Sequence, residues 1–86
     1  MPEISRFFGI VIAMFYNDHA PPHFHARYGA HQALIAVRDL SVLHGSLPPR
    51  VLGLVMEWAA LHQSELAEDW ELARSLAPLK SIAPLE

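Results

Sequence analysis

The chain is 86 residues long, carries a formal net charge of -3 and contains no cysteine. A chain of this length makes one small domain that buries only about 60% of its unfolded surface. The lack of cysteine excludes disulfides and thiolate zinc sites. The negative net charge argues against a dedicated nucleic-acid-binding protein, because affinity for phosphates comes mainly from clustered lysine and arginine.

Hydrophobic residues make up 52% of the chain and charged residues only 17%. This is more apolar material than a compact monomer of this size easily hides. We therefore expect a partner, either a second copy in a homo-oligomer or a small companion protein.

The N-terminal region is expected to contain neither a targeting signal nor a membrane segment. The apolar run over residues 7–12 follows a single basic residue, Arg6, and leads into Asn17 and Asp18 without a small-residue cleavage site. No apolar run approaches the roughly 20 residues of a membrane helix. We expect a cytoplasmic protein that has no contact with a membrane.

The first half of the chain predicts β-strands. Residues 4–7 and 10–16 are rich in β-branched and aromatic side chains, and Gly9 lies between them, which favours a hairpin. Both alternating sets within residues 10–16 are apolar, so we expect this strand to be buried on both faces and to lie at the centre of the sheet. Further strands are predicted over residues 23–28 and 32–37. Residues 39–45 fit a turn plus a short strand about as well as one helical turn.

Residues 48–75 change to the spacing of a helix, with apolar side chains every three or four positions. The members of this stripe are Val51, Leu54, Val55, Trp58, Leu61, Leu66, Trp70 and Ala73. Pro48 and Pro49 are tolerated in a first helical turn, where N–H groups have no partner within the helix. Ser64 has the chemistry of an N-cap, which favours two helices over one.

The sequence also predicts the surroundings of two further groups of side chains in the helical half. The two tryptophans of the stripe are expected to be core or interface anchors. Four acidic residues are expected to form a solvated face or a patch for a basic partner. These are Glu65, Glu68, Asp69 and Glu71.

These patterns together predict an α+β fold, a small and mainly antiparallel sheet of three to five strands followed by a C-terminal helical segment of one or two helices. We expect a single domain over residues 1–86, with a strand-rich half over 1–45 and a helical half over 46–75. Residues 76–86 are expected to form an extended tail, because Pro78 and Pro84 oppose a helix and the apolar residues between them favour packing against the domain.

The segment 18–25, with the sequence DHAPPHFH, carries most of the chemical information. Each proline biases the residue before it towards extended backbone. The alternation over residues 23–28 then places His23, His25 and Arg27 on one face of a strand. Cα atoms two residues apart on a strand are about 6.5 to 7 Å apart, so both imidazoles can reach one ligand.

Several kinds of site fit these residues. His23 and His25, with His19 or Asp18 as a third group, have the donors of a transition-metal site such as zinc or iron. The same side chains also fit a structural hydrogen-bond network that fixes the turn, or contacts to a ligand or partner protein.

A catalytic alternative assigns one histidine as general base and another as general acid, with Arg27 stabilising an anion, as in cleavage of RNA. His62, beside Glu65, joins the cluster if its helix packs across that side of the sheet, and otherwise lies at the rim. The candidate ligand- or partner-binding residues are Asp18, His19, His23, His25, Arg27 and His62, and the metal candidates among them are His19, His23 and His25.

A family resemblance covers almost the whole chain. It is carried by Ile4-Ser5, Gly9-Ile10-Val11-Ile12, Asp18-His19, Pro21-Pro22-His23-Phe24-His25-Ala26, Tyr28, Gly45, Leu47-Pro48, Val55, Glu57-Trp58, Leu61-His62, Glu65-Leu66, Trp70-Glu71-Leu72-Ala73, Leu79-Lys80 and Ile82-Ala83-Pro84-Leu85. In these residues the chain resembles the bacterial family called domain of unknown function 4160. Two features depart from that pattern, Gly53 within the helical stripe and the apolar segment 41–43, and both affect the boundaries of the helix and the turn.

The resemblance implies a small intracellular protein of a family without an assigned activity. Members are often encoded beside a second small protein, the domain of unknown function 2442, some of whose members look like regulatory DNA-binding proteins. The resemblance thus implies a two-protein module of toxin–antitoxin or regulatory type. From all these observations we expect a non-enzymatic protein-interaction or ligand-binding module. The alternatives are a histidine-dependent ribonuclease-like toxin and a metal-binding domain.

Overall fold

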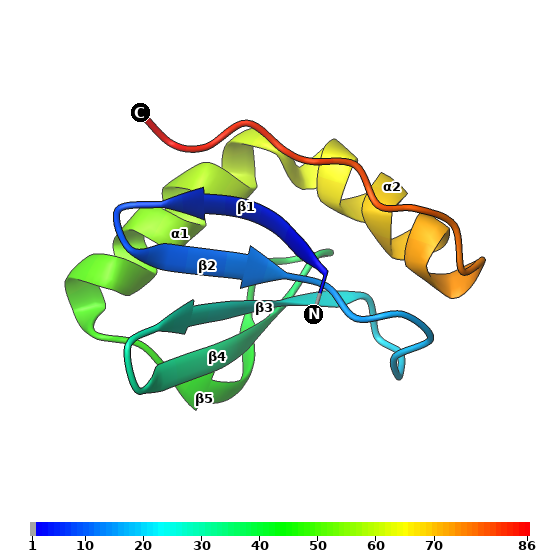
Figure 1. Ribbon diagram of the computed structural model, residues 1–86. Helices are drawn as coiled ribbons and strands as arrows, with labels where there is room; N and C mark the ends of the chain where they lie inside the picture. Colours follow the sequence, from blue (N-terminus) through cyan, green and yellow to red (C-terminus); the bar gives the residue numbers. More distant parts are fainter. Residues whose placement is uncertain (1) are drawn as a thin grey trace.

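An antiparallel sheet of five strands is followed by two helices in the computed structural model, which describes residues 2–86; Met1 of the expected range 1–86 lies outside the described residues. The elements are β1 (Glu3–Phe7), β2 (Ile10–Ala13), β3 (His23–Tyr28), β4 (His31–Ala36), β5 (Val42–Ser46), α1 (Pro49–Leu61) and α2 (Gln63–Arg74). Neighbouring strands in the chain are neighbours in the sheet, in the order β1-β2-β3-β4-β5. The predicted α+β fold is confirmed (Figure 1).

The central strand is β3, so the prediction that residues 10–16 form the central strand is wrong. Strand β2 ends at Ala13, and the chain turns at Asn17, whose φ of 56° lies in the left-handed region that asparagine tolerates. The predicted burial of both faces of β2 is confirmed. Ile10 and Ile12 face the core, while Val11 and Ala13 are buried on the opposite face.

The ambiguous segment 39–45 is a turn followed by the start of β5. Gly45 has a φ of 79°, and a Cβ atom there would lie 2.2 Å from the backbone oxygen of Gln32 on β4. Only glycine therefore allows β5 to pair this closely with β4. The spacing of apolar residues in the sequence carries no sign of this close approach between two strands, so it does not distinguish a turn plus strand from a helical turn in this segment.

Helix α1 packs on one face of the sheet, and its Trp58 is the largest fully buried side chain. The Trp58 ring contacts the rings of Phe7 and Phe24, at centroid distances of 5.4 and 6.0 Å. Trp70 of α2 is also buried, so both tryptophans are core anchors, as predicted. Within residues 2–86, neither helix combines the length and apolar character needed to cross a bilayer.

The break between the helices lies at His62, earlier than the predicted cap at Ser64. His62 has a φ of -123° and makes no side-chain cap hydrogen bond. Because the chain changes direction here, the helical stripe does not continue in register, and Leu61 is 68% exposed instead of buried. The two helices therefore have separate apolar faces.

The segment after α2 runs beside β1, where Figure 1 shows it in red. The backbone N–H of Ile82 donates to the carbonyl of Ile4 at 2.8 Å, and the Trp58 indole N–H donates to the carbonyl of Ala83 at 2.8 Å. The outer edge of β1 is thereby covered. All five residues of β5, at the other edge of the sheet, are exposed.

Asp69 is buried, so the prediction that it belongs to a solvated acidic face is wrong. Its carboxylate accepts a hydrogen bond from the backbone N–H of Lys80 through Oδ1 at 2.9 Å, and its Oδ2 has no hydrogen-bond partner among residues 2–86. Burial raises the pKa of Asp69 above its usual value. The Asp69 carboxylate on α2 thus anchors the C-terminal segment, but burying its charge costs free energy of folding.

We predict that Asp69→Asn changes the dependence of stability on pH. In the folded protein Asp69 keeps its proton to a higher pH than in the unfolded chain, where the pKa lies near 3.8. Between these two pKa values the folded state binds more protons than the unfolded state. The free energy of unfolding of the wild type therefore falls as pH rises through the pKa of Asp69 in the folded protein. The asparagine side chain of the variant retains the acceptor oxygen without a charge.

The free energy of unfolding, measured by denaturant titration from about pH 4 to pH 7, should fall more for the wild type than for Asp69→Asn. Glu71→Gln, at an exposed position of the same helix, is the matched control and should follow the wild type. A difference between wild type and Asp69→Asn that stays constant over this pH range would contradict the assignment.

Candidate functional site

The loop between β2 and β3 brings Asp18 beside the start of β3. The backbone N–H of His19 donates to Asp18 Oδ1 at 2.8 Å, which occupies one carboxylate oxygen. The Ala20–Pro21 peptide bond is cis. The carbonyl of Pro22 accepts a hydrogen bond from the N–H of Val37 at 3.0 Å, so the end of the loop is fixed to the segment after β4.

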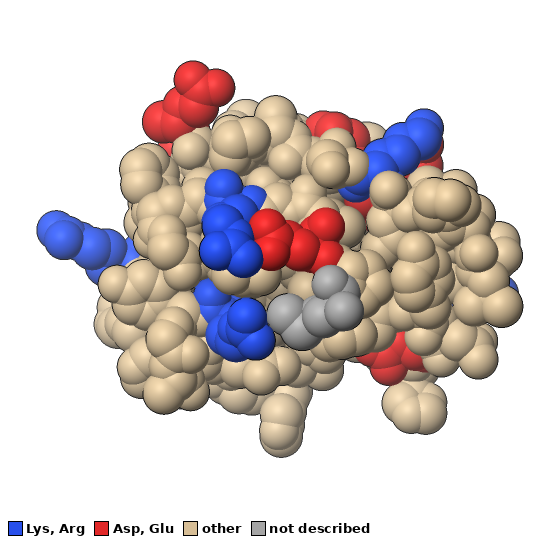
Figure 2. All heavy atoms as spheres, in the orientation of Figure 1, with Lys and Arg blue, Asp and Glu red and all other residues tan. Residues whose placement is uncertain are grey.

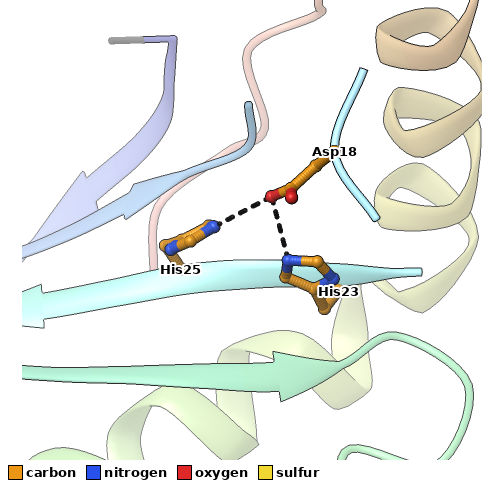
Figure 3. A group of neighbouring side chains, drawn as sticks. All are labelled: Asp18, His23 and His25. Atoms are coloured by element: carbon orange, nitrogen blue, oxygen red, sulfur yellow. Dashed lines mark hydrogen bonds and ion pairs between the residues drawn. The ribbon is translucent and has the colours of Figure 1, made fainter. Parts of the chain in front are cut away.

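His23 and His25 project from β3 towards the remaining carboxylate oxygen of Asp18, as Figure 3 shows. The Nε2 atoms of His23 and His25 lie 3.0 and 3.4 Å from Asp18 Oδ2. One donor atom from each of the three residues lies within 4.8 Å of the other two. The two imidazoles and the carboxylate thus meet at one point, and we call these three residues the Asp18 cluster.

The His23 ring is fixed from several sides. It is buried, with its centroid 5.2 Å from the Trp70 ring and 5.3 Å from the His25 ring. Its Nδ1 lies 2.8 Å from the carbonyl oxygen of Pro21. Because a carbonyl only accepts hydrogen bonds, Nδ1 carries a proton and donates it, and Nε2 is the nitrogen that faces Asp18.

His25 has a different environment. Its ring meets the Phe15 ring edge-on at 4.4 Å, and its Nδ1 lies 3.4 Å from the amide nitrogen of Gln32. With the Gln32 amide nitrogen as donor, Nδ1 accepts and Nε2–H donates to Asp18. Burial lowers the pKa of His25, and the hydrogen bond and charge of Asp18 only partly oppose this effect.

Asp18 is the charged member of the cluster. Partial burial acts to raise its pKa, but the hydrogen bonds from the His19 backbone and the two imidazoles outweigh burial, and the pKa of Asp18 lies below its usual value. A carboxylate fixed in this way presents a negative charge to both imidazole nitrogens.

A small recess adjoins His25 on the sheet face opposite α1. It has a volume of about 30 Å³ and is lined by Val11, Ala13, Phe15, His25, Arg27 and Gln32. Arg27 lies on the same face of β3 as the two histidines, as the alternation predicts, but makes no hydrogen bond to the Asp18 cluster. The recess has room for about one or two water molecules.

A larger hollow lies between the double proline and α2. Its volume is about 460 Å³, and its lining is mainly apolar. The lining residues are Pro21, Pro22, Val37, Arg38, Ala67, Trp70 and Glu71. Trp70 therefore separates this hollow from the buried side of His23.

The structure leaves three of the candidate residues outside the cluster, namely Arg27, His19 and His62. His19 has an exposed side chain and contributes only its backbone N–H to Asp18. His62 packs on Trp58 at a ring distance of 5.5 Å, and its Nδ1 lies 2.5 Å from Glu65 Oε1. Asp18, rather than His19, is the third group beside His23 and His25.

Sequence reasoning missed three groups that hold the imidazoles, namely the Pro21 carbonyl, Phe15 and Gln32. The sequence does contain a signal for the position of Gln32. A tight turn at Gly29 and Ala30 fixes the register of the hairpin, and this register places Gln32 opposite Arg27. Phe15 lies beyond the end of β2, where the strand alternation no longer indicates its direction.

Comparison with known proteins gives a family match over most of the chain. The model of the family described as Domain of unknown function (DUF4160) matches residues 9–71, which include the whole Asp18 cluster. No curated protein and no solved structure matches the chain. The matched residues form most of the chain, which therefore belongs to the DUF4160 family.

Proposed function

We propose that this domain is a non-enzymatic binding module and that the Asp18 cluster is its ligand site. The observation that carries the proposal is the direction of both imidazoles, whose Nε2 atoms lie 3.0 and 3.4 Å from one carboxylate oxygen. Three donor atoms at one point, fixed by surrounding contacts, favour holding a ligand between them.

The same geometry argues against the ribonuclease alternative. General acid–base cleavage of RNA needs one histidine to accept a proton and another to donate one at separate atoms of the substrate. Here both Nε2 atoms face the same carboxylate oxygen, and the adjoining recess of about 30 Å³ is too small for a nucleotide. Figure 2 shows Lys and Arg only in small groups on the face that it presents, with no continuous positive surface to attract RNA.

We predict that the purified protein leaves RNA intact. Wild type, His23→Ala and His25→Ala are incubated with a fluorescently labelled single-stranded RNA, and the products are separated on a denaturing gel. Intact RNA in all three samples is the expected result, because neither imidazole is placed for proton transfer to a substrate. Cleavage by the wild type that both variants lose would establish the ribonuclease alternative.

We further propose that the partner is a second copy of this chain, joined through the edge of β5. The edge of β1 is covered by the C-terminal segment, whereas the five residues of β5 are exposed and include no charged residue and no proline. Val42 and Leu43 are 42% and 44% exposed. Such an edge offers free backbone groups for pairing, and antiparallel pairing of β5 with its copy satisfies two-fold symmetry.

The alternative is that a companion protein, the other half of a toxin–antitoxin or regulatory pair, binds the edge of β5. The family resemblance suggests this alternative. The chain contains no cysteine, so neither assembly depends on disulfides, and both are compatible with a reducing cytoplasm. Self-association is the proposal, because a strand without charged residues pairs with its own copy without opposing like charges.

Light scattering coupled to size exclusion tests self-association. The wild type should have the mass of two chains at high concentration, and Leu43→Lys should shift towards one chain, because charge on an edge strand opposes pairing. Phe8→Lys is the matched control, since Phe8 is also exposed, at 59%, but lies in the β1–β2 turn. A wild-type mass of one chain at every concentration would overturn self-association and leave the companion protein.

A further inference from the structure

We infer that the Asp18 cluster binds a first-row divalent transition-metal cation, with Zn²⁺ as the cation tested first. The ligands are Nε2 of His23, Nε2 of His25 and the Oδ2 carboxylate oxygen of Asp18. This inference rests on the proposed ligand site and names the chemical class of its ligand.

The donor spacing fits a single metal ion. Nitrogen and oxygen donors lie about 2.0–2.1 Å from zinc, so two donors of a tetrahedral ion are about 3.4 Å apart. The two Nε2 atoms lie 3.0 and 3.4 Å from Asp18 Oδ2, and all three donor atoms lie within 4.8 Å of one another. The side chains therefore need only small movements to place their donors around one ion.

The direction of the His23 ring gives a second geometric argument. Nδ1 lies 2.8 Å from the carbonyl oxygen of Pro21 and donates to it. This contact directs Nε2 at Asp18 Oδ2, 3.0 Å away, where one cation can contact both atoms.

Metal-binding histidines usually donate the other ring N–H to a carboxylate or a backbone carbonyl, which fixes the tautomer and the direction of the ring. The Pro21 carbonyl does this for His23. The contact between the rings of His23 and Trp70 prevents the imidazole from turning away. His23 is therefore already oriented to use Nε2 as a ligand.

His25 requires one rearrangement. In the structure its Nε2–H donates to Asp18 and its Nδ1 accepts from the Gln32 amide. Metal binding moves the single ring proton to Nδ1, and a half-turn of the Gln32 amide presents Oε1 as its acceptor. The ring stays neutral, and Gln32 acts as a positioning residue.

The donor set selects the class of metal. Two imidazoles and one carboxylate suit zinc, iron, nickel, cobalt or copper, whereas magnesium and calcium prefer oxygen ligands. The side chains of His25 and Asp18 are 14% and 21% exposed, so solvent reaches the cluster. Three protein ligands leave at least one coordination position for water or a further ligand.

The test is a titration of tag-free, chelator-treated protein with Zn²⁺ in competition with a chromophoric chelator. A parallel titration with Co²⁺ monitors the visible absorption of the bound ion. We expect one equivalent of Zn²⁺ per chain, a Co²⁺ spectrum of low-symmetry nitrogen and oxygen coordination, and no competition by Mg²⁺.

Asp18→Asn and His23→Gln should each weaken Zn²⁺ binding by more than about 10-fold, because each removes a ligand. His31→Gln, which changes an exposed histidine on β4, is the matched control and should bind as the wild type does. The far-ultraviolet circular dichroism of each variant reports on folding, and if His23→Gln does not fold, the nearly isosteric Asp18→Asn alone decides.

Equal Zn²⁺ affinity for wild type and Asp18→Asn, or binding that His31→Gln weakens to the same extent, would overturn the metal site. Such a result would not change the expected outcomes of the other two experiments, which are intact RNA after incubation and a mass of two chains in light scattering. Cleavage of RNA that depends on His23 and His25 would instead overturn the proposed binding function. The two failures are therefore distinguishable.

Discussion

The carboxylate of Asp18 joins the β2–β3 loop to the central strand, and the site depends on this interaction. One of its oxygens accepts the backbone N–H of His19, and the other lies against both imidazoles. The Pro21 carbonyl adds a second link to His23, and the Pro22 carbonyl adds a third to Val37. A loop held at three places can position a charged group beside partly buried rings without leaving that charge unpaired.

The contact between His23 and Trp70 extends the same network to the helical half. Trp70 belongs to α2, and the neighbouring Asp69 fixes the backbone of Lys80 in the C-terminal segment. This segment then covers β1 through Ile82. The Asp18 cluster and the covered edge of the sheet are thus connected through two adjacent residues of α2, and β5 remains the open edge.

Much of the fold follows from local patterns in the sequence. The alternation over residues 23–28 predicts β3 and the shared face of His23 and His25, because strand geometry alone determines it. The helical spacing predicts the buried positions of Trp58 and Trp70. The double proline and the polar turn at Asn17 indicate where the loop lies, so the place of the candidate site was also predictable.

The features that sequence reasoning missed depend on contacts between distant residues. The central position of β3 follows from the pairing of all five strands, and the composition of β2 alone does not reveal it. The burial of Asp69 depends on the backbone of Lys80, 11 residues further along the chain. The exposure of Leu61 follows from the change of direction at His62, where no proline or glycine marks the break. The choice of Asp18 over His19 depends on the path of the loop.

The central claim is that the Pro21 carbonyl holds His23 with its proton on Nδ1 and its Nε2 directed at Asp18. Long-range proton–nitrogen correlation spectra of the histidine rings test this claim most directly, because they distinguish the two nitrogens of each ring. The account predicts a proton on Nδ1 of His23 without metal, and changes at Nε2 of His23 and His25, but not in the exposed His31 and His44 rings, on addition of Zn²⁺. A His23 ring that carries its proton on Nε2 alone, or spectra in which Zn²⁺ alters all four rings equally, would contradict the account.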